Sequence, residues 1–167
     1  YTPMDNWSEL ALKTVPEYVD RIIESGCRGM YVCGSTGEGI SLTTDERKAV
    51  TEAFVTATAG RVPVVVQVGA NALPTSCELA AHAQSVGANA VSCNAPSYYK
   101  VGTPELLTDV TAKIAAAAAD VPFYYYHIPA MTGAAIDLIA YLDLASVRIP
   151  NLAGIKYTES FAFVYQE

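Results

Sequence analysis

The sequence contains no apolar run that approaches the roughly 20 residues of a transmembrane helix. Even the alanine-rich run 114–119 is too short for that role. A charged n-region followed by an apolar h-region, which a secretory signal requires, is also missing. We therefore expect a cytoplasmic protein without a membrane partner.

Basic residues are scarce. The chain has 10 lysines and arginines against 17 aspartates and glutamates, and its net charge at pH 7 is −7. Nucleic acids and anionic membranes attract basic surfaces. The charge balance therefore argues against a nucleic-acid partner and favours a small-molecule substrate or another protein.

Cysteines are few, and none of them follows the CxxC or other spacing that metal sites use. Two of them lie in strand-like runs, which is typical of buried thiols in a reducing compartment. Neither disulfides nor a bound metal is predicted. The cysteines are Cys27, Cys33, Cys77 and Cys93.

Nucleotide-binding fingerprints are absent as well. The stretch Gly34-Ser-Thr-Gly-Glu-Gly39 is not GxGxxG, and it is not a Walker loop because no lysine follows its final glycine. No cofactor is therefore predicted. The stretch can present N–H groups to an anion, or it can be a tight turn that uses glycine for positive φ, and both interpretations stay open at this point.

What the sequence does contain is a repeating unit of strand and helix. With 167 residues and 51% hydrophobic positions, the chain can bury one substantial core, and we expect a single domain over residues 1–167. Near-continuous runs of β-branched and aromatic residues predict strands buried on both faces of a parallel sheet. These runs are 29–34, 62–69, 88–93, 121–126 and 152–157.

Helices are predicted between these strands. A threonine followed three residues later by a glutamate is a capping box, and Thr14–Glu17, Thr43–Glu46 and Thr75–Glu78 fit it. Thr103-Pro104 predicts a fourth helix start, and residues 135–147 a fifth helix. Glycines suited to helix ends follow at Gly26, Gly60 and Gly87.

Alternating strands and helices indicate an α/β fold, either a (β/α)8 barrel or an open doubly wound sheet, and periodicity does not choose between them. A barrel typically needs about 250 residues, so a barrel here would be partial. Unusual polar residues follow the strand ends. In both folds the carboxyl ends of the strands form the site.

Lys156 is the lysine that stands inside an apolar, strand-like run, 151–158. The other lysines lie in polar helical or loop contexts, where an ammonium group stays hydrated. Burial disfavours the charged form of a lysine and leaves a free amine that can attack a ketone. A strand lysine can also be an ion-pair partner or an end-of-strand residue, so the pattern alone does not assign its role.

Three motifs in this order resemble the N-acetylneuraminate lyase and dihydrodipicolinate synthase superfamily. They are Gly34-Ser-Thr-Gly-Glu-Gly39, Tyr126-His-Ile-Pro129 and Gly154-Ile-Lys-Tyr-Thr158. The resemblance extends from Tyr1-Thr-Pro-Met4 to the start of a sixth helix. It implies a (β/α)8 barrel that lacks most of strand 1 and all of strands 7 and 8, and class I aldolase chemistry through a Schiff base without a metal.

The resemblance also implies roles for individual residues. Lys156 matches the family's Schiff-base lysine and Tyr126 its proton-shuttling tyrosine. Ser35 and Thr36 match the hydroxyl pair that holds the carboxylate of the 2-oxo acid. Thr158 matches a position that lines the substrate pocket.

The resemblance also implies a homotetramer. In that family an aromatic residue that follows one of the strands reaches into the site of a neighbouring subunit. Tyr98 is the best match for that residue, although Tyr99 is only one position away. His127 follows Tyr126 directly, and strand alternation predicts that it faces the helical layer in a structural role.

The branch of the family is indicated by Met131. Dihydrodipicolinate synthases usually carry an arginine at this position, five residues after Tyr126, whereas sialate lyases carry an apolar residue. The run 123–129 is similar to animal-type sialate lyases. We therefore expect cleavage of N-acetylneuraminate to N-acetylmannosamine and pyruvate. The alternatives are dihydrodipicolinate synthesis, cleavage of a 2-keto-3-deoxy sugar acid, an inactive partial barrel, and an open-sheet nucleotide-binding domain.

Overall fold

The computed structural model describes residues 1–159. Its centre is a sheet of five parallel strands in the order β1-β2-β3-β4-β5. The sequence predicted each of these strands, and their bounds fall inside the predicted runs or one residue beyond them. The strands are β1 (Met30–Val32), β2 (Val64–Gln67), β3 (Ala90–Asn94), β4 (Phe123–His127) and β5 (Leu152–Tyr157).

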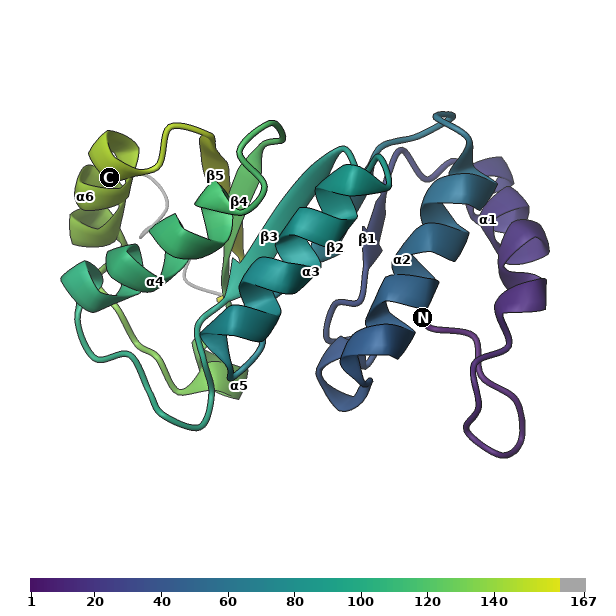
Figure 1. Ribbon diagram of the computed structural model, residues 1–167, viewed down its shortest axis with the longest axis horizontal. Coiled ribbons are helices and arrows are strands. Elements are labelled where there is room, and N and C mark those ends of the chain that lie inside the picture. Colours follow the sequence, from purple (N-terminus) through teal and green to yellow (C-terminus); the bar gives the residue numbers. More distant parts are fainter. Residues whose placement is uncertain (160–167) are drawn as a thin grey trace.

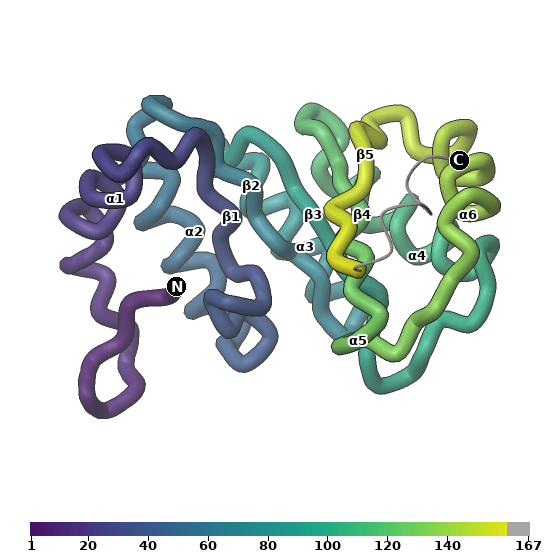
Figure 2. The backbone as a smooth tube through the Cα atoms, turned by 180° about the vertical axis from the view of Figure 1, so that it is seen from behind, coloured from purple at the N-terminus to yellow at the C-terminus, as the bar shows by residue number. Residues whose placement is uncertain are grey.

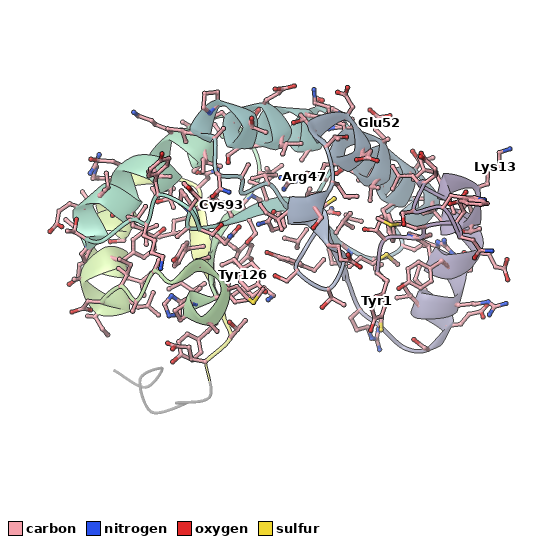
Figure 3. All side chains as sticks on the ribbon, turned by 90° about the horizontal axis from the view of Figure 1, so that it is seen from below. Tyr1, Lys13, Arg47, Glu52, Cys93 and Tyr126 are labelled. Atoms are coloured by element: carbon pink, nitrogen blue, oxygen red, sulfur yellow. The ribbon has the colours of Figure 1, made fainter. Side chains whose placement is uncertain are left out.

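Helices alternate with the strands, beginning with α1 ahead of β1, and the main helices cover one face of the sheet (Figure 1). They are α1 (Val15–Glu24), α2 (Thr44–Thr58), α3 (Leu73–Ser85), α4 (Pro104–Ala116), α5 (Pro129–Thr132) and α6 (Leu138–Arg148), with short 3-10 turns at η1 (Leu12–Thr14) and η2 (Gly39–Ser41). Figure 2 shows the sheet from behind, where the strands lie in front of the main helices. The layers form an arch with helices outside and strands inside (Figure 3).

The strand order confirms the partial barrel that the family resemblance implied, and it excludes the open doubly wound sheet that periodicity had left open. A doubly wound sheet reverses its strand order at a switch point and carries helices on both faces. Here the order follows the sequence, and the main helices lie on one side. The fold is therefore a partial (β/α)8 barrel, with β1 and β5 as the edges of the described sheet.

The core lies between the strands and the helices. Phe123 and Tyr125 of β4 point into it, and Tyr125 packs against Tyr141 of α6 at a ring-centroid distance of 4.9 Å. Tyr126, the residue after Tyr125, points to the inner side and contacts Tyr31 of β1. Because alternate strand residues face opposite sides, β4 joins the core and the inner face of the arch.

Two of the predicted helix starts are capped as expected. At α2, Thr43 accepts a hydrogen bond from the Glu46 N–H, and the Glu46 carboxylate accepts one from the Thr43 N–H, which completes the capping box. At α4, Thr103 stands directly before Pro104, and its hydroxyl accepts a hydrogen bond from the Leu106 N–H. The glycines predicted at helix ends, Gly26, Gly60 and Gly87, all have positive φ.

Two capping boxes were predicted wrongly. Thr14 does precede α1, but its hydroxyl donates to the Ala11 carbonyl at 2.8 Å and caps nothing. The helix assigned to Thr75 begins earlier, at Leu73, because Pro74 is already suited to the first turn. Glu78 pairs instead with Lys48 of α2.

The last predicted helix also begins later than expected. Its first residue is Leu138, not residue 135, because the Asp137 carboxylate accepts a hydrogen bond from the Ala140 N–H. The sixth helix implied at the end of the chain falls in residues 160–167, outside the described part.

Candidate active site

The candidate site lies at the carboxyl ends of the strands. Tyr126 of β4 is in register with Lys156 of β5 on one side and with Asn94 of β3 on the other. The loop 34–39 follows β1 at the same edge. Parallel pairing therefore brings the loop to the same edge as Lys156, although the two lie about 120 positions apart in the sequence.

Lys156 is half-buried, and its amine rests on aromatic rings. The Nζ atom lies 3.5 Å from the centroid of the Tyr126 ring and 5.1 Å from that of Tyr31. Within residues 1–159 Lys156 forms no salt bridge. The ion-pair interpretation that the sequence left open therefore has no support in the described part of the chain.

Tyr126 links the amine to the loop. Its hydroxyl lies 3.3 Å from the Ser35 hydroxyl, and either group can donate. Its ring packs edge-on against Tyr31 at 5.7 Å. The structure thus joins Lys156, Tyr126 and Ser35 in one continuous set of contacts. Thr36 is next to Ser35 in the same turn, and both are exposed to solvent.

The loop is held in an unusual backbone conformation. Cys33 and Glu38 have φ values of 57° and 54°, which non-glycine residues adopt at a cost of order 1 kcal/mol or more. Gly39 is packed so closely that a Cβ there would lie 1.9 Å from the Cys33 carbonyl oxygen. The Gly39 N–H donates to the Gly34 carbonyl, closing the loop. Glycine is therefore needed at position 39 for close packing, which the sequence interpretation of a glycine turn did not specify.

Thr158 and Tyr98 are placed differently from this group. The Thr158 hydroxyl donates to the His127 carbonyl at 2.8 Å, which ties the end of β5 to that of β4. Tyr98 is 76% exposed on the loop after β3 and packs edge-on against Tyr99. Neither residue is in the contact chain that joins Lys156 to Ser35.

His127 lies in the layer predicted for it. It is buried, its ring packs near Tyr125 and stacks on Tyr157, and its Nε2 atom lies 3.0 Å from a Glu159 carboxylate oxygen. These contacts connect the residue after Tyr126 with the residues after Lys156. They are consistent with a structural role.

A cavity of about 340 Å³ opens beside the loop. It is lined by Ser35 and Glu38 of the loop and by Met131 of the short helix α5. Gln67 and Asn94, at the ends of β2 and β3, complete the wall. Asn94 is one of the polar residues at strand ends that the sequence indicated, whereas Gln67 was missed. The signal for Gln67 was also present, because it is a polar residue at the carboxyl end of an apolar strand.

Tyr31 was also missed. Burial, partly offset by the hydrogen bond to Ser92, raises the pKa of its phenol well above 10. The phenol therefore stays protonated and donates to the Ser92 hydroxyl at 3.0 Å. Tyr31 supports Lys156 and Tyr126 through its ring.

The described residues were also compared with the requirements of a metal site and of a membrane-spanning helix. Among residues 1–159 no group of three or more histidine, cysteine, aspartate or glutamate side chains could hold a metal ion. In the same part of the chain, no helix has both the length and the apolar character needed to cross a membrane.

Comparison with known proteins gives consistent matches over nearly the whole chain. The model of the Dihydrodipicolinate synthetase family matches residues 1–163. The N-acetylneuraminate lyase of Homo sapiens is 39% identical over 161 residues, which cover 95% of this chain and 50% of that protein. The chain thus spans about half the length of the curated relatives it matches.

Solved structures agree with this result. The Proteus mirabilis N-acetylneuraminate lyase superimposes with a TM-score of 0.96 at 33% identity, covering 99% of this chain and 56% of that one. The dihydrodipicolinate synthase of Aquifex aeolicus superimposes with a TM-score of 0.87 at 30% identity, covering 95% of this chain and 53% of that one. Both branches named by the sequence analysis therefore share the fold.

Proposed function

The chain belongs to the dihydrodipicolinate synthetase family, and from this premise we propose that it forms part of a class I aldolase that cleaves N-acetylneuraminate to N-acetylmannosamine and pyruvate. The observation that carries the proposal is the contact chain from the Lys156 amine to the Tyr126 ring and from the Tyr126 hydroxyl to Ser35. Nucleophile, proton carrier and carboxylate-binding loop are the parts that Schiff-base aldol cleavage needs.

Lys156 begins the reaction. Its neutral amine attacks the C2 carbonyl of the open-chain sugar acid, and loss of water gives a protonated imine. The hydroxyls of Ser35 and Thr36, with N–H groups of the loop, hold the substrate carboxylate and so orient the carbonyl for attack. This role gives the strained conformation of the loop a purpose, since a fixed loop holds the carboxylate in one position.

Tyr126 then moves the proton. It takes the proton of the C4 hydroxyl as its own phenolic proton passes by way of Ser35 to the substrate carboxylate. The C3–C4 bond breaks in the same step, which releases the aldehyde sugar and leaves the electron pair in an enamine on Lys156. Protonation of the enamine at C3 restores the imine, and water hydrolyses it to pyruvate and the free amine. The Ser35 hydroxyl, 3.3 Å from the Tyr126 hydroxyl, is suited to accept or return that proton.

Met131 favours the lyase over dihydrodipicolinate synthesis. It is 69% exposed on α5 and lines the cavity. An apolar side chain there offers no charge to the carboxylate of an amino-aldehyde substrate. The names of the relatives reported above point in the same direction. Cleavage of a 2-keto-3-deoxy sugar acid is the alternative that uses the same machinery with a different sugar tail.

We also propose a cytoplasmic homotetramer in which Tyr98 reaches into a neighbouring subunit's site. The support for association is the pair of exposed rings at Tyr98 and Tyr99, since large aromatic side chains at the surface are typical of interfaces. The support for a reducing compartment is that Cys33 and Cys93 are buried, unpaired thiols.

The test is chemical trapping followed by a cleavage assay. The intact protein is incubated with pyruvate and sodium cyanoborohydride, and the modified peptide is identified by mass spectrometry. We expect an adduct on Lys156, no adduct in Lys156→Ala, and an unchanged adduct in the control Lys13→Ala, since Lys13 is exposed on η1. Pyruvate release from N-acetylneuraminate and from a 2-keto-3-deoxy sugar acid is then compared.

Each result has a defined meaning. An adduct with faster release from N-acetylneuraminate supports the proposal, and faster release from the other sugar acid supports the alternative. A folded protein that forms no adduct at Lys156 refutes Schiff-base chemistry and leaves the inactive partial barrel.

A further inference from the structure

Arg47 is a buried cation that lies behind the wall of the site cavity. Its side chain starts from the first turn of α2 and is only 3% exposed. Nη1 donates to the Gly69 carbonyl at 3.0 Å, and Nη2 donates to the carbonyl and to the side-chain oxygen of Gln67, both at 2.7 Å. Figure 3 shows Arg47 near the middle of the arch and Tyr126 on its inner side.

No carboxylate within residues 1–159 forms a salt bridge with this guanidinium. Its Nε atom is buried and has no hydrogen-bond partner in that part of the chain. Burial lowers the pKa of Arg47, but an arginine remains protonated throughout the physiological range. Buried charges are normally paired, since an unpaired one is costly. A cost of this kind is expected where the charge serves binding.

Gln67 transmits the position of Arg47 to the cavity. It is 6% exposed and lines the wall. Because its side-chain oxygen accepts from Arg47, its amide nitrogen must point the other way, and there it donates to the side-chain oxygen of Asn94. Asn94, which also lines the wall, in turn donates to the Ala95 carbonyl at 3.1 Å.

The packing around this chain of hydrogen bonds admits little change. A Cβ at Gly69 would lie 2.4 Å from the Asn94 side-chain oxygen, so the closeness of Gly69 to Asn94 requires glycine. The hydrogen bonds along the wall are therefore fixed from α2 through β2 to β3, and the Arg47 guanidinium stands at the helix end of this series, behind the wall.

Glu38 is a carboxylate that lines the same cavity, and its charge opposes that of Arg47. It is exposed, so water screens it strongly. Arg47 is buried, where screening is weak. The partial positive charge at the N-terminus of α2 is offset by Asp45 and Glu46 in its first turn, so the buried cation that remains is Arg47.

We propose that Arg47 is a positioning residue that fixes Gln67 and Asn94 on the cavity wall and whose unpaired charge makes the site selective for anionic 2-oxo acids over neutral ketones. This inference rests on the proposed Schiff-base function and extends it, because it assigns the selection of charge to a residue that does not touch the substrate. It predicts an effect on substrate affinity, with little effect on the chemical steps at Lys156.

The experiment compares two small ketones in the trapping reaction at Lys156. Pyruvate carries a carboxylate, and methyl pyruvate is its neutral ester. The concentration that gives half-maximal adduct is measured for each ketone in the wild type, Arg47→Gln, Arg47→Met and Arg47→Lys. The matched control is Lys48→Gln, which removes one positive charge from the adjacent residue, where the lysine pairs with Glu78 on the surface.

Loss of the charge should affect pyruvate alone. We expect Arg47→Gln and Arg47→Met to raise the half-maximal pyruvate concentration roughly tenfold and to leave that of methyl pyruvate unchanged. Arg47→Lys should keep most of the preference for pyruvate because it keeps the charge. Lys48→Gln should match the wild type with both ketones.

Other outcomes overturn the proposal. Equal shifts for both ketones mean that Arg47 only supports the wall, and no shift means that its charge does not reach the site. If the neutral variants do not fold, Arg47→Lys decides. Loss of the pyruvate preference in that variant overturns the proposal, because the positive charge is still present. A wild type that traps neither ketone refutes the proposed function itself, and this result is distinguishable because it appears without any substitution.

Discussion

Tyr126 and Lys156 occupy directly paired positions of β4 and β5, and the Lys156 amine lies 3.5 Å from the centre of the Tyr126 ring. The ring and the hydroxyl of Tyr126 therefore have separate partners. The ring supports the amine, whereas the hydroxyl faces Ser35. Substitutions can separate these two roles.

Tyr126→Phe keeps the ring and removes the hydroxyl. We expect adduct formation with pyruvate to persist, while kcat for cleavage of the sugar acid falls roughly 10²- to 10⁴-fold, because the C4 hydroxyl loses its proton acceptor. Trapping and steady-state cleavage, measured on the same preparation, provide the check. Tyr18→Phe, on α1, is the matched control and should retain cleavage. Full cleavage in Tyr126→Phe would assign proton transfer to another group.

Thr43→Ala removes the working capping box of α2. The free energy of unfolding should fall by about 1 kcal/mol, since the helix loses a cap that satisfies one of its N–H groups. Urea denaturation measures the change. Thr14→Ala provides the comparison, because Thr14 precedes α1 without capping it, and its effect should be clearly smaller. Equal losses in the two variants would show that the observed cap contributes nothing specific.

The same contrast shows how far the sequence determines what can be predicted. Thr14, Thr43 and Thr75 share one spacing to a glutamate, yet only Thr43 forms the capping box. The Thr14 hydroxyl binds the Ala11 carbonyl instead, and Pro74 starts its helix ahead of Thr75. The spacing between threonine and glutamate does not encode either effect. The strands were predictable, since an apolar run must be buried whatever its neighbours. Periodicity alone did not distinguish a barrel from an open sheet, whereas the family motifs implied the barrel and the strand order confirms it.

The site also contains residues that the sequence indicated and residues that only the fold reveals. Lys156 stood out because a lysine in an apolar run is unusual, and family motifs supplied Ser35, Thr36 and Tyr126. Tyr31 and Arg47 could not be found from local sequence. An aromatic residue in a strand and an arginine in a helix are ordinary until the fold brings their side chains to the ends of other strands.

Gly39→Ala tests the tight packing of the loop. A methyl group at this position would collide with the Cys33 carbonyl, so the loop must move or the fold must loosen. We expect a loss of stability of about 3 kcal/mol or more, together with weaker pyruvate trapping because Ser35 shifts. Thermal unfolding and the trapping assay measure the two effects. Gly102→Ala is the control, since a Cβ there meets nothing within 4 Å. A fully stable and active Gly39→Ala would mean that the loop is not held at this contact.

Alkaline pH should destabilise the protein through its buried phenols. Burial raises the pKa of Tyr31, Tyr125 and Tyr141 well above the ordinary value of 10. Below pH 10 these groups are protonated in both states and stability is unaffected. Above pH 10 the unfolded chain releases protons that the folded chain retains, so stability falls as the pH rises toward the folded-state values.

Tyr125→Phe removes one of these phenols from the core without removing its ring. The free energy of unfolding, measured by urea denaturation at several pH values from 8 to 11, should decline less steeply above pH 10 than in the wild type. Tyr99→Phe is the matched control, because Tyr99 is 85% exposed and its phenol meets similar surroundings in both states. A slope in Tyr125→Phe identical to that of the wild type would mean that the Tyr125 phenol ionises in the folded protein as readily as in the unfolded chain, and that its burial does not oppose the charge.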